Sequence, residues 1–196
     1  SEAFNDACVA AYKAHPAHFL GLAILPMQDP KMAVAELNRV ASQPGIRGVY
    51  MATRILDKEL SDPTFFPVYE AIEDLQLTIF LHPVEVVDPQ RLKQFYLTNF
   101  IGNPTESAIA ASHLIFGQVL DRFPKLTFCL PHAGGTFPYL IGRITHGWGV
   151  REECRHLKTS PVNYLRRFYY DTITHAQPAL EYLISLVGPD RVVLGS

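Results

Sequence analysis

Four absences narrow the possible classes of this 196-residue chain. No apolar run approaches the 18 or more residues of a membrane-spanning helix, and no secretory signal peptide opens the chain. The formal net charge of −2 leaves no basic excess to attract nucleic acid or an anionic membrane. No G-x-G-x-x-G follows a predicted strand, so a dinucleotide-binding sheet has no support. We therefore expect no nucleic-acid partner and no membrane partner.

Cysteine is scarce as well. Cys8, Cys129 and Cys154 are three in number and widely spaced, which argues against a disulfide framework and indicates a reducing compartment. We accordingly expect a cytoplasmic protein. Cys129 lies inside an apolar run and is most simply a small core residue. The eight histidines are more informative than the cysteines.

The hydrophobic pattern predicts strands that alternate with helices. We expect strands over residues 19–25, 46–52, 77–81, 126–130, 168–172 and 191–196, with helices over 2–14, 30–43, 63–75, 103–122, 136–146 and 178–187. No tight hairpin signal links any two strands, so parallel strands with right-handed crossovers are expected. The chain is 48% hydrophobic, enough for one sizeable core, and residues 1–196 are predicted to form one domain.

Three helix starts carry recognisable capping signals. Asp29-Pro30 and Asp62-Pro63 each place a capping oxygen before a proline at the first helical position. Asn103 is followed three residues later by Glu106, which predicts a capping box.

Polar residues follow the carboxyl ends of successive strands: Arg54, His82, His132, Asp171 and Ser196. In a (β/α)8 TIM-type barrel those ends surround one mouth, so the pattern favours a barrel over a doubly wound α/β sheet. A barrel needs eight strands, and this chain supplies about six. The last strand also has no helix after it. We therefore expect an incomplete barrel that lacks its first strand and its C-terminal part.

Two of these strands end in a histidine beside a proline. His82 follows one apolar run and precedes Pro83, whereas His132 follows Pro131 and precedes a glycine pair. A lone histidine of this kind is most often a hydrogen-bonded structural residue. The repetition instead favours two imidazoles that converge on one mouth. Residues 83–102 are aromatic-rich and longer than an ordinary loop, and we interpret them as a candidate lid or pocket wall.

Several motifs, in order along the chain, resemble those of one family. They are the segments 19–27 (FLGLAILPM), 65–70 (FFPVYE), 80–83 (FLHP), 102–106 (GNPTE), 131–135 (PHAGG), 142–147 (GRITHG) and 192–196 (VVLGS). Over nearly its whole length the chain is similar to the amidohydrolase superfamily, of the amidohydrolase-2 type. Within that superfamily it most resembles a branch of decarboxylases.

The resemblance implies a divalent metal at the barrel mouth, zinc in the usual case and manganese as the alternative. It makes His82 one ligand, while a His-x-His pair and an Asp expected directly after Ser196 lie outside the sequence. It makes His132 the acid/base that works with metal-bound water. Arg151 matches an arginine that binds a substrate carboxylate. Arg143 matches an arginine that reaches into a neighbouring subunit's active site, which implies a homodimer.

The implied activity is a metal-dependent decarboxylase, a carbon–carbon lyase acting on a small unsaturated or aromatic carboxylic acid. Zinc lowers the pKa of bound water to about 7, and a nearby imidazole can pass a proton to or from the substrate. Two alternatives stay open: a metal-dependent hydrolase of a C–C, ester or amide bond, and a non-catalytic truncated paralogue that binds or regulates. The sequence also departs from the branch. His82-Pro-Val-Glu85 stands for His-Pro-Trp-Asp, and Ala133 replaces the first of three glycines, which leaves the substrate open.

The remaining polar residues receive weaker interpretations. We favour helix-capping or supporting roles for His146 and His175, and structural or surface roles for the other four histidines: His15, His18, His113 and His156. Asp171 could orient His132 or cap a helix, and we favour a structural role. Arg54 is a candidate substrate contact at a strand end.

Overall fold

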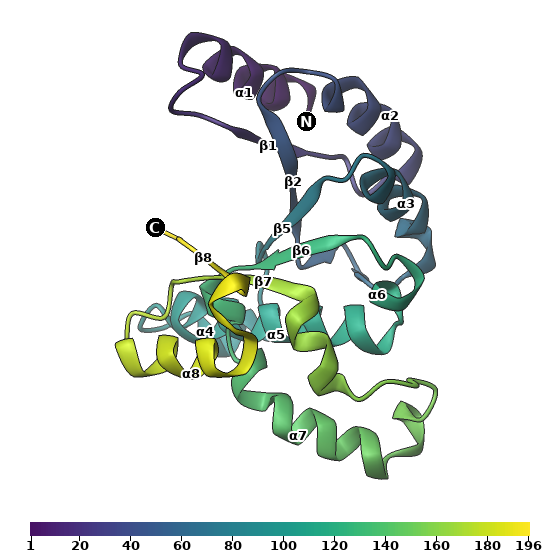
Figure 1. Cartoon of the computed structure of the whole chain (residues 1–196), viewed down its shortest axis with the longest axis vertical. Helices are drawn as coiled ribbons and strands as arrows, with labels where there is room; N and C mark the ends of the chain where they lie inside the picture. The colour runs from purple at the N-terminus through teal and green to yellow at the C-terminus, as the bar shows by residue number, and fades with distance from the viewer.

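In a computed structural model that describes residues 1–196, six strands form one fully parallel sheet. The strands are β1 (Gly21–Ile24), β2 (Ile46–Ala52), β5 (Thr78–His82), β6 (Thr127–Leu130), β7 (Phe168–Asp171) and β8 (Val192–Val193). They lie side by side in chain order, each paired in parallel with the next. A doubly wound sheet reverses its strand order near the middle, whereas a barrel keeps it sequential. The barrel-type α/β prediction is therefore confirmed, and the sheet curves accordingly (Figure 1).

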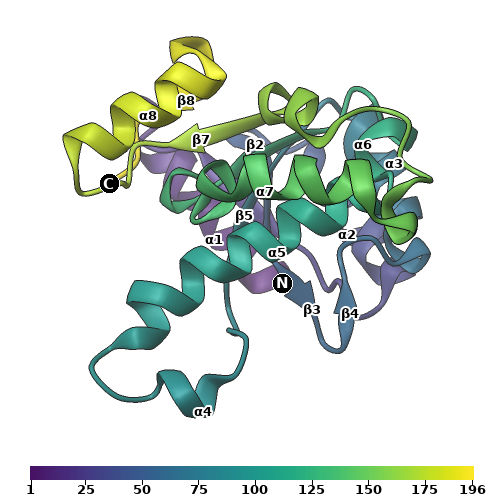
Figure 2. The ribbon, with the colours of Figure 1, turned by 90° about the horizontal axis from the view of Figure 1, so that it is seen from below.

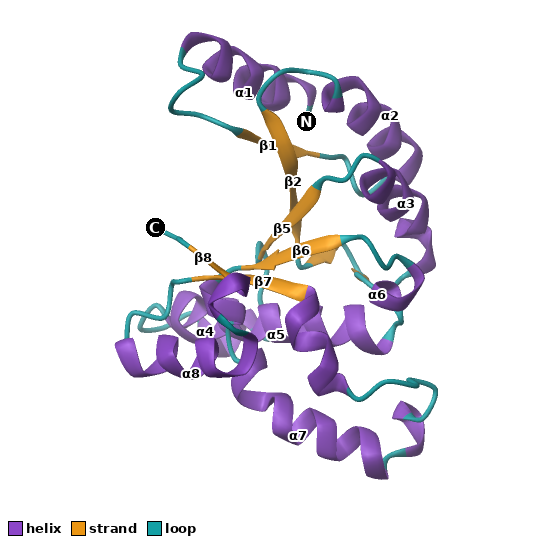
Figure 3. Ribbon diagram, viewed as in Figure 1, coloured by secondary structure: helices purple, strands orange, loops and turns teal.

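Most of the helices cover the convex side of this curved sheet (Figure 3), whereas α4 lies on an arm that projects from the body (Figure 2). The helices are α1 (Glu2–Ala14), α2 (Pro30–Ala41), α3 (Phe66–Asp74), α4 (Pro89–Leu92), α5 (Asn103–Phe116), α6 (Val119–Arg122), α7 (Phe137–Val150) and α8 (Gln177–Val187). Short 3-10 turns and one π-helical turn, η2 (Thr98–Gly102), connect some of them. None of these helices is both long enough and apolar enough to span a membrane.

The two faces of the sheet carry different side chains because successive residues of a strand point to opposite faces. One row on the convex face joins the main core: Val49, Ile79, Phe128 and Phe168, aligned across four strands and fully buried. The next row, on the concave face, contains Tyr50, Phe80, Cys129 and Tyr169. Cys129 is buried, as predicted.

Two of the three capping predictions are confirmed. The Asp29 carboxylate accepts hydrogen bonds from the backbone N–H groups of Lys31 and Met32, and the Asp62 carboxylate accepts one from Thr64. The capping box at Asn103 is wrong: Asn103 is itself helical, and its side chain makes no capping hydrogen bond because η2 runs directly into α5.

Other boundaries also differ from the sequence-based expectation. A short antiparallel hairpin, β3 (Arg54–Ile55) with β4 (Lys58–Glu59), lies outside the main sheet, so the expectation of parallel pairing alone is wrong there. Its turn uses Leu56 in the left-handed region (φ 55°), a position where glycine or asparagine would have marked a turn. Gln118, also left-handed (φ 56°), separates α5 from α6. Helix α7 continues to Val150, four residues past its predicted end.

A buried polar cluster fastens α1 to the outer strand. The side-chain amide of Asn5, fully buried, accepts a hydrogen bond from the Ile24 backbone N–H at 2.9 Å and donates one to the Ile24 carbonyl at 3.0 Å. The same amide donates to the carboxylate of Glu36, which Arg39 holds with two further hydrogen bonds. These contacts link α1, β1 and α2.

Candidate active site

His82 is the last residue of β5 and lies on the concave side of the sheet. Its ring stacks on Tyr50, with centroids 5.9 Å apart and planes at 23°. Its Nδ1 atom is 2.8 Å from the carbonyl oxygen of Pro83. A carbonyl accepts only, so Nδ1 carries the proton and Nε2 is left with its lone pair. This is the arrangement in which an imidazole binds a metal.

His132 lies beyond the end of β6 in a turn of unusual backbone geometry. His132 and Ala133 both have a positive φ of 55°, a conformation that costs about 1–2 kcal/mol per non-glycine residue. The His132 ring centroid is 5.3 Å from that of His82, with the planes at 59°. The prediction that two strand-end imidazoles converge is therefore confirmed.

Asp171, at the end of β7, holds this turn in place. It is 6% exposed, and its carboxylate accepts hydrogen bonds from the backbone N–H groups of His132 at 3.0 Å and Ala133 at 2.7 Å. A third hydrogen bond comes from the Ile173 backbone. The structural role favoured for Asp171 is confirmed in this form: it positions His132 through the main chain and makes no hydrogen bond to the ring.

The glycine pair after His132 allows a close approach between two segments. Gly135 has φ 60° and ψ −128°, a region open to glycine alone, and a Cβ atom there would lie 2.1 Å from the carbonyl oxygen of Pro104. The Pro104 carbonyl accepts a hydrogen bond from the Thr136 N–H at 3.1 Å. The His132 turn is thus packed directly against the start of α5.

Burial and neighbouring charge shift the titration of His132. Burial is the main cause that lowers its pKa, and the imidazoles of His82 and His175 lower it further, while the Asp171 carboxylate opposes them. Its Nδ1 atom is buried and has no hydrogen-bond partner. The ring is therefore held neutral more readily than a free histidine, and it binds an added proton weakly.

The fit of this site to a metal rests on these imidazoles. His82 offers an unprotonated Nε2 atom, and the buried, unpartnered Nδ1 of His132 lies in the same mouth. No group of three or more His, Cys, Asp or Glu side chains that could hold a metal ion occurs in residues 1–196. The chain thus fits one side of a metal site through His82 without forming a complete ligand set.

A cavity of about 680 Å³ opens beside His132, and we call it the rim cavity. It lies between η2, the starts of α5, α7 and α8, and the loop after β7. Its wall is formed by Asn99, Phe100, Pro104, His132, Ala133, Gly135, Thr136, Pro138, Tyr139, Ile173, Thr174, His175, Pro178, Ala179, Tyr182 and Leu183. Asn99 and Phe100 belong to the segment interpreted as a lid or pocket wall, and their position agrees with the second reading.

The structure places the predicted arginines away from the two histidines of the same chain. Arg143 is exposed on α7 and lines a groove between α5 and α7. Arg151 is exposed after α7 and pairs with Glu153 at 2.8 Å. Arg54, in the β3–β4 hairpin, is 3.7 Å from Glu59 and lines a different, smaller cavity, which gives no support to the expected substrate contact.

Two histidine interpretations can now be compared with the structure. His146 is exposed on α7 and is not part of the rim cavity wall, whereas His175 is. Asn99 was expected at a pocket wall and lies in this one. Sequence reasoning missed Tyr139 and Tyr182 as wall residues, because tyrosines inside helical stripes look like core residues.

Comparisons with known proteins agree with this geometry. A family model described as amidohydrolase matches residues 2–196. The chain is 36% identical over 195 residues to 2-amino-3-carboxymuconate-6-semialdehyde decarboxylase of Dictyostelium discoideum, covering 98% of the chain and 54% of that protein.

Solved structures show the same fold. A 5-carboxyvanillate decarboxylase, LigW, from Sphingomonas paucimobilis matches with a TM-score of 0.88 and 32% identity, over 97% of this chain and 59% of that one. The apo form of the IDCase of Metarhizium anisopliae matches with a TM-score of 0.93 and 27% identity, over 99% and 55%. The chain therefore spans between half and three fifths of the length of these proteins.

Proposed function

Because the chain belongs to the amidohydrolase family, we propose that its two strand-end histidines serve a metal-dependent decarboxylase of small aromatic or unsaturated carboxylic acids. The single observation that supports this most is the approach of His132 to within 5.3 Å of His82, centroid to centroid, at the end of a parallel sheet. Relatives with 36% and 32% identity are named as decarboxylases of acids of this kind.

The chemistry follows from the proton balance of the reaction. Loss of CO2 replaces a C–C bond by a C–H bond, so the carbon that loses its carboxylate must receive a proton. His132 is the imidazole placed to deliver that proton, because it lies beside His82 at the strand ends. Asp171 fixes where the ring stands by holding the backbone beneath it. A divalent ion held in part by Nε2 of His82 would supply Lewis-acid stabilisation of the negative charge that develops.

We propose zinc as the metal, with manganese as the alternative. A ring nitrogen is a good ligand for both, so His82 does not discriminate between them. A dihydroxybenzoic acid decarboxylase from Polaromonas, a fold neighbour at 24% identity, was solved with bound manganese. Elemental analysis of the purified full-length protein decides between the two metals.

The first test separates the two histidines in the full-length protein. With 5-carboxyvanillate, the substrate in the name of one relative, we expect CO2 release. His132→Ala should lower turnover by roughly 10²–10⁴ while metal content stays near normal, the usual size of an acid/base contribution. His82→Ala should instead reduce the metal content. If His132→Ala strips the metal, His132 is a ligand, and if no small aromatic acid releases CO2, the proposed activity is wrong.

We also propose a homodimer in which Arg143 reaches the mouth of the partner subunit, while Arg151 binds a substrate carboxylate. The separation of both arginines from His132 within one chain is consistent with a contribution across an interface. A guanidinium matches a carboxylate with two parallel hydrogen bonds, which lysine cannot reproduce.

Subunit mixing tests the role across the interface. Arg143→Ala and His132→Ala proteins, each inactive alone, should recover part of the activity when mixed, because one site in each mixed dimer has both groups intact. No recovery in verified mixed dimers would remove Arg143 from this role. We further propose a cytoplasmic location, based on three free cysteines.

A further inference from the structure

The ring of His82 rests against an aromatic side chain from the next strand. Tyr50 lies on β2, which runs beside β5 in the sheet (Figure 1). Its ring stacks on the His82 ring, with centroids 5.9 Å apart and planes only 23° from parallel. That separation lies inside the range of about 4.5–7 Å in which aromatic rings attract one another. The other ring beside His82, that of His132, meets it at 59° and does not lie flat on it.

The register of the sheet makes this contact possible. In the pairing of β2 with β5, Phe80 stands opposite Tyr50, and His82 stands opposite Ala52. Tyr50 is therefore the diagonal neighbour of His82, a separation that aromatic side chains can span. Because Ala52 has only a methyl group, the His82 ring meets no bulky side chain at its direct partner and can lie on Tyr50. Tyr50 also stacks on Phe80 at 28°, so the ring is supported from its own row.

A histidine ring needs more than one contact to be fixed in space. The hydrogen bond of 2.8 Å between Nδ1 of His82 and the Pro83 carbonyl sets which ring nitrogen carries the proton. A single contact at the ring edge still leaves the ring free to tilt about it. The face of Tyr50 removes this tilt, because two rings attract each other most while they overlap. Together the two contacts fix the tautomer of His82 and the direction of its Nε2 lone pair.

We infer that Tyr50 is a positioning residue for His82: its ring fixes the plane of the imidazole and, with it, the direction in which Nε2 can bind a metal. The inference rests on the proposed role of His82 as a metal ligand, and it assigns Tyr50 no contact with metal or substrate. The stack involves the ring alone, so the hydroxyl group is not required. Groups that orient a metal-binding histidine typically change metal affinity by about 10–100-fold when they are removed.

Zinc affinity of the full-length protein, measured by competition with a chelator, tests this role. Tyr50→Leu keeps an apolar side chain on the strand but removes the flat face, and it should weaken zinc binding about 10-fold or more. Tyr50→Phe keeps the ring and should stay within about 2-fold of the wild type. Tyr169→Leu is the matched control: it removes another ring of the concave row, one that packs under Arg191, and it should also stay within about 2-fold.

A metal-free measurement separates ring orientation from general stability. In protein with isotopically labelled histidine nitrogens, NMR shifts report which ring nitrogen of His82 carries the proton, and the His82→Ala protein identifies the signal. At a pH where the ring is neutral, we expect the Nδ1–H form in the wild type and in Tyr50→Phe. Tyr50→Leu should show a mixture of both tautomers, because a tilted ring no longer directs Nδ1 at the Pro83 carbonyl. A merely structural role would alter stability without moving this signal.

Two results would overturn the inference. If Tyr50→Leu binds zinc as tightly as the wild type, or keeps only the Nδ1–H form, the hydrogen bond to Pro83 orients the ring alone. If Tyr50→Phe weakens zinc binding as much as Tyr50→Leu does, the hydroxyl is responsible and not the ring. Should Tyr50→Leu not fold, Tyr50→Met, also apolar and without a flat face, takes its place. If the wild type binds no zinc, or His82→Ala binds it equally well, the proposed function fails instead, and the tautomer measurement alone decides whether Tyr50 orients His82.

Discussion

The ends of β5 and β6 look alike in sequence and differ in structure. Each ends an apolar run with histidine next to proline, and the two rings lie 5.3 Å apart, centroid to centroid. His82 is still part of its strand and is fixed through its ring, by the hydrogen bond from Nδ1 to the carbonyl of Pro83. His132 lies past its strand in a left-handed turn and is fixed through its backbone, while its ring Nδ1 has no partner.

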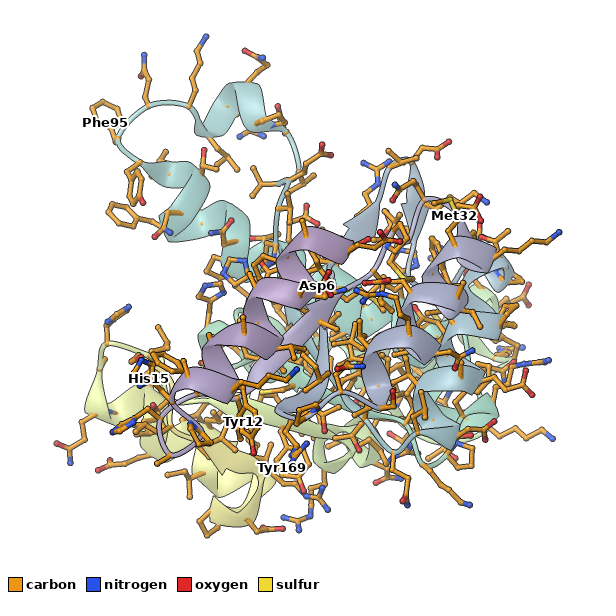
Figure 4. All side chains as sticks on the ribbon, turned by 90° about the horizontal axis from the view of Figure 1, so that it is seen from above. Asp6, Tyr12, His15, Met32, Phe95 and Tyr169 are labelled. Atoms are coloured by element: carbon orange, nitrogen blue, oxygen red, sulfur yellow. The ribbon has the colours of Figure 1, made fainter.

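The segments that follow the two histidines also differ in how closely they pack against the rest of the protein. After His82 the chain runs through a long arm, α4 and η2, that projects from the body beside α5 (Figure 2). Phe95 stands at the tip of this arm and is 81% exposed (Figure 4). After His132 the chain turns within four residues into α7, packed against α5. The His82 ring is oriented by a ring hydrogen bond, so the segment that follows it can project from the body. The His132 ring has no such bond, so its orientation depends on a tightly packed backbone.

The largest effect should come from Gly135, which allows the tight turn. Gly135→Ala places a Cβ atom at 2.1 Å from the Pro104 carbonyl oxygen in a glycine-only backbone region, and we expect a loss of about 3 kcal/mol or more in the free energy of unfolding. The matched control is Gly142→Ala in α7, where a Cβ would meet nothing within 4 Å and should stabilise the helix by about 0.5–1 kcal/mol. Urea unfolding measures both, and equal values for the two would show that the turn relaxes freely.

Asp171 should give the next largest effect. Asp171→Asn keeps the size of the side chain but removes the charge that binds three backbone N–H groups. We expect a loss of about 2 kcal/mol in stability together with lower turnover, since the His132 turn loses its anchor. Asp190→Asn is the control, because its ion pair with Arg166 is exposed and contributes about 1 kcal/mol or less. A stable Asp171→Asn protein with normal turnover would mean that the turn holds its shape alone.

The first turn of α5, directly after the arm, offers the smallest effect, through Glu106. Burial raises the pKa of this carboxyl, with help from Glu59 and Glu85, whereas the Val87 backbone N–H and Arg54 oppose the shift. A folded-state pKa above the unfolded value means that stability is highest at low pH and declines as pH rises through the folded pKa. Glu106→Gln should therefore be more stable than the wild type near pH 7, and the two should converge near pH 4. If the free energies of unfolding of the two proteins change in parallel with pH, ionised Glu106 is not destabilising.

Much of the fold could be predicted from the sequence, because hydrophobic periodicity and proline signals depend only on nearby residues. The strand over 46–52 and the helix over 2–14 were predicted to the residue. The wrong boundary predictions share a cause. Leu56, Gln118 and Asn103 adopt backbone conformations that differ from the local preferences of their residue types, because tertiary packing holds them there. A left-handed leucine or glutamine carries no signal in the sequence, since glycine or asparagine is the usual marker of that geometry.

The site residues also divide into those that the sequence predicts and those that only packing determines. The convergence of His82 and His132 was predictable because parallel strands bring their carboxyl ends to one edge. The role of Asp171 was only half predictable, because a carboxylate at a strand end gives no indication whether it binds a ring or a backbone. Only one wall of the rim cavity was predictable, the segment that contains Asn99, because the opposite wall comes from helix starts that are distant in sequence and are brought together by packing.

The amide of Asn5 sets how α1 and β1 are aligned. It accepts a hydrogen bond from the Ile24 N–H and donates one to the Ile24 carbonyl, so a single side chain satisfies both main-chain groups of that residue. A side-chain amide here does what the backbone of a neighbouring strand would do. Because its donor and its acceptor both meet one residue, a shift of the helix by even one residue along the strand would break the pair, and Asn5 thus fixes the register of α1 against β1.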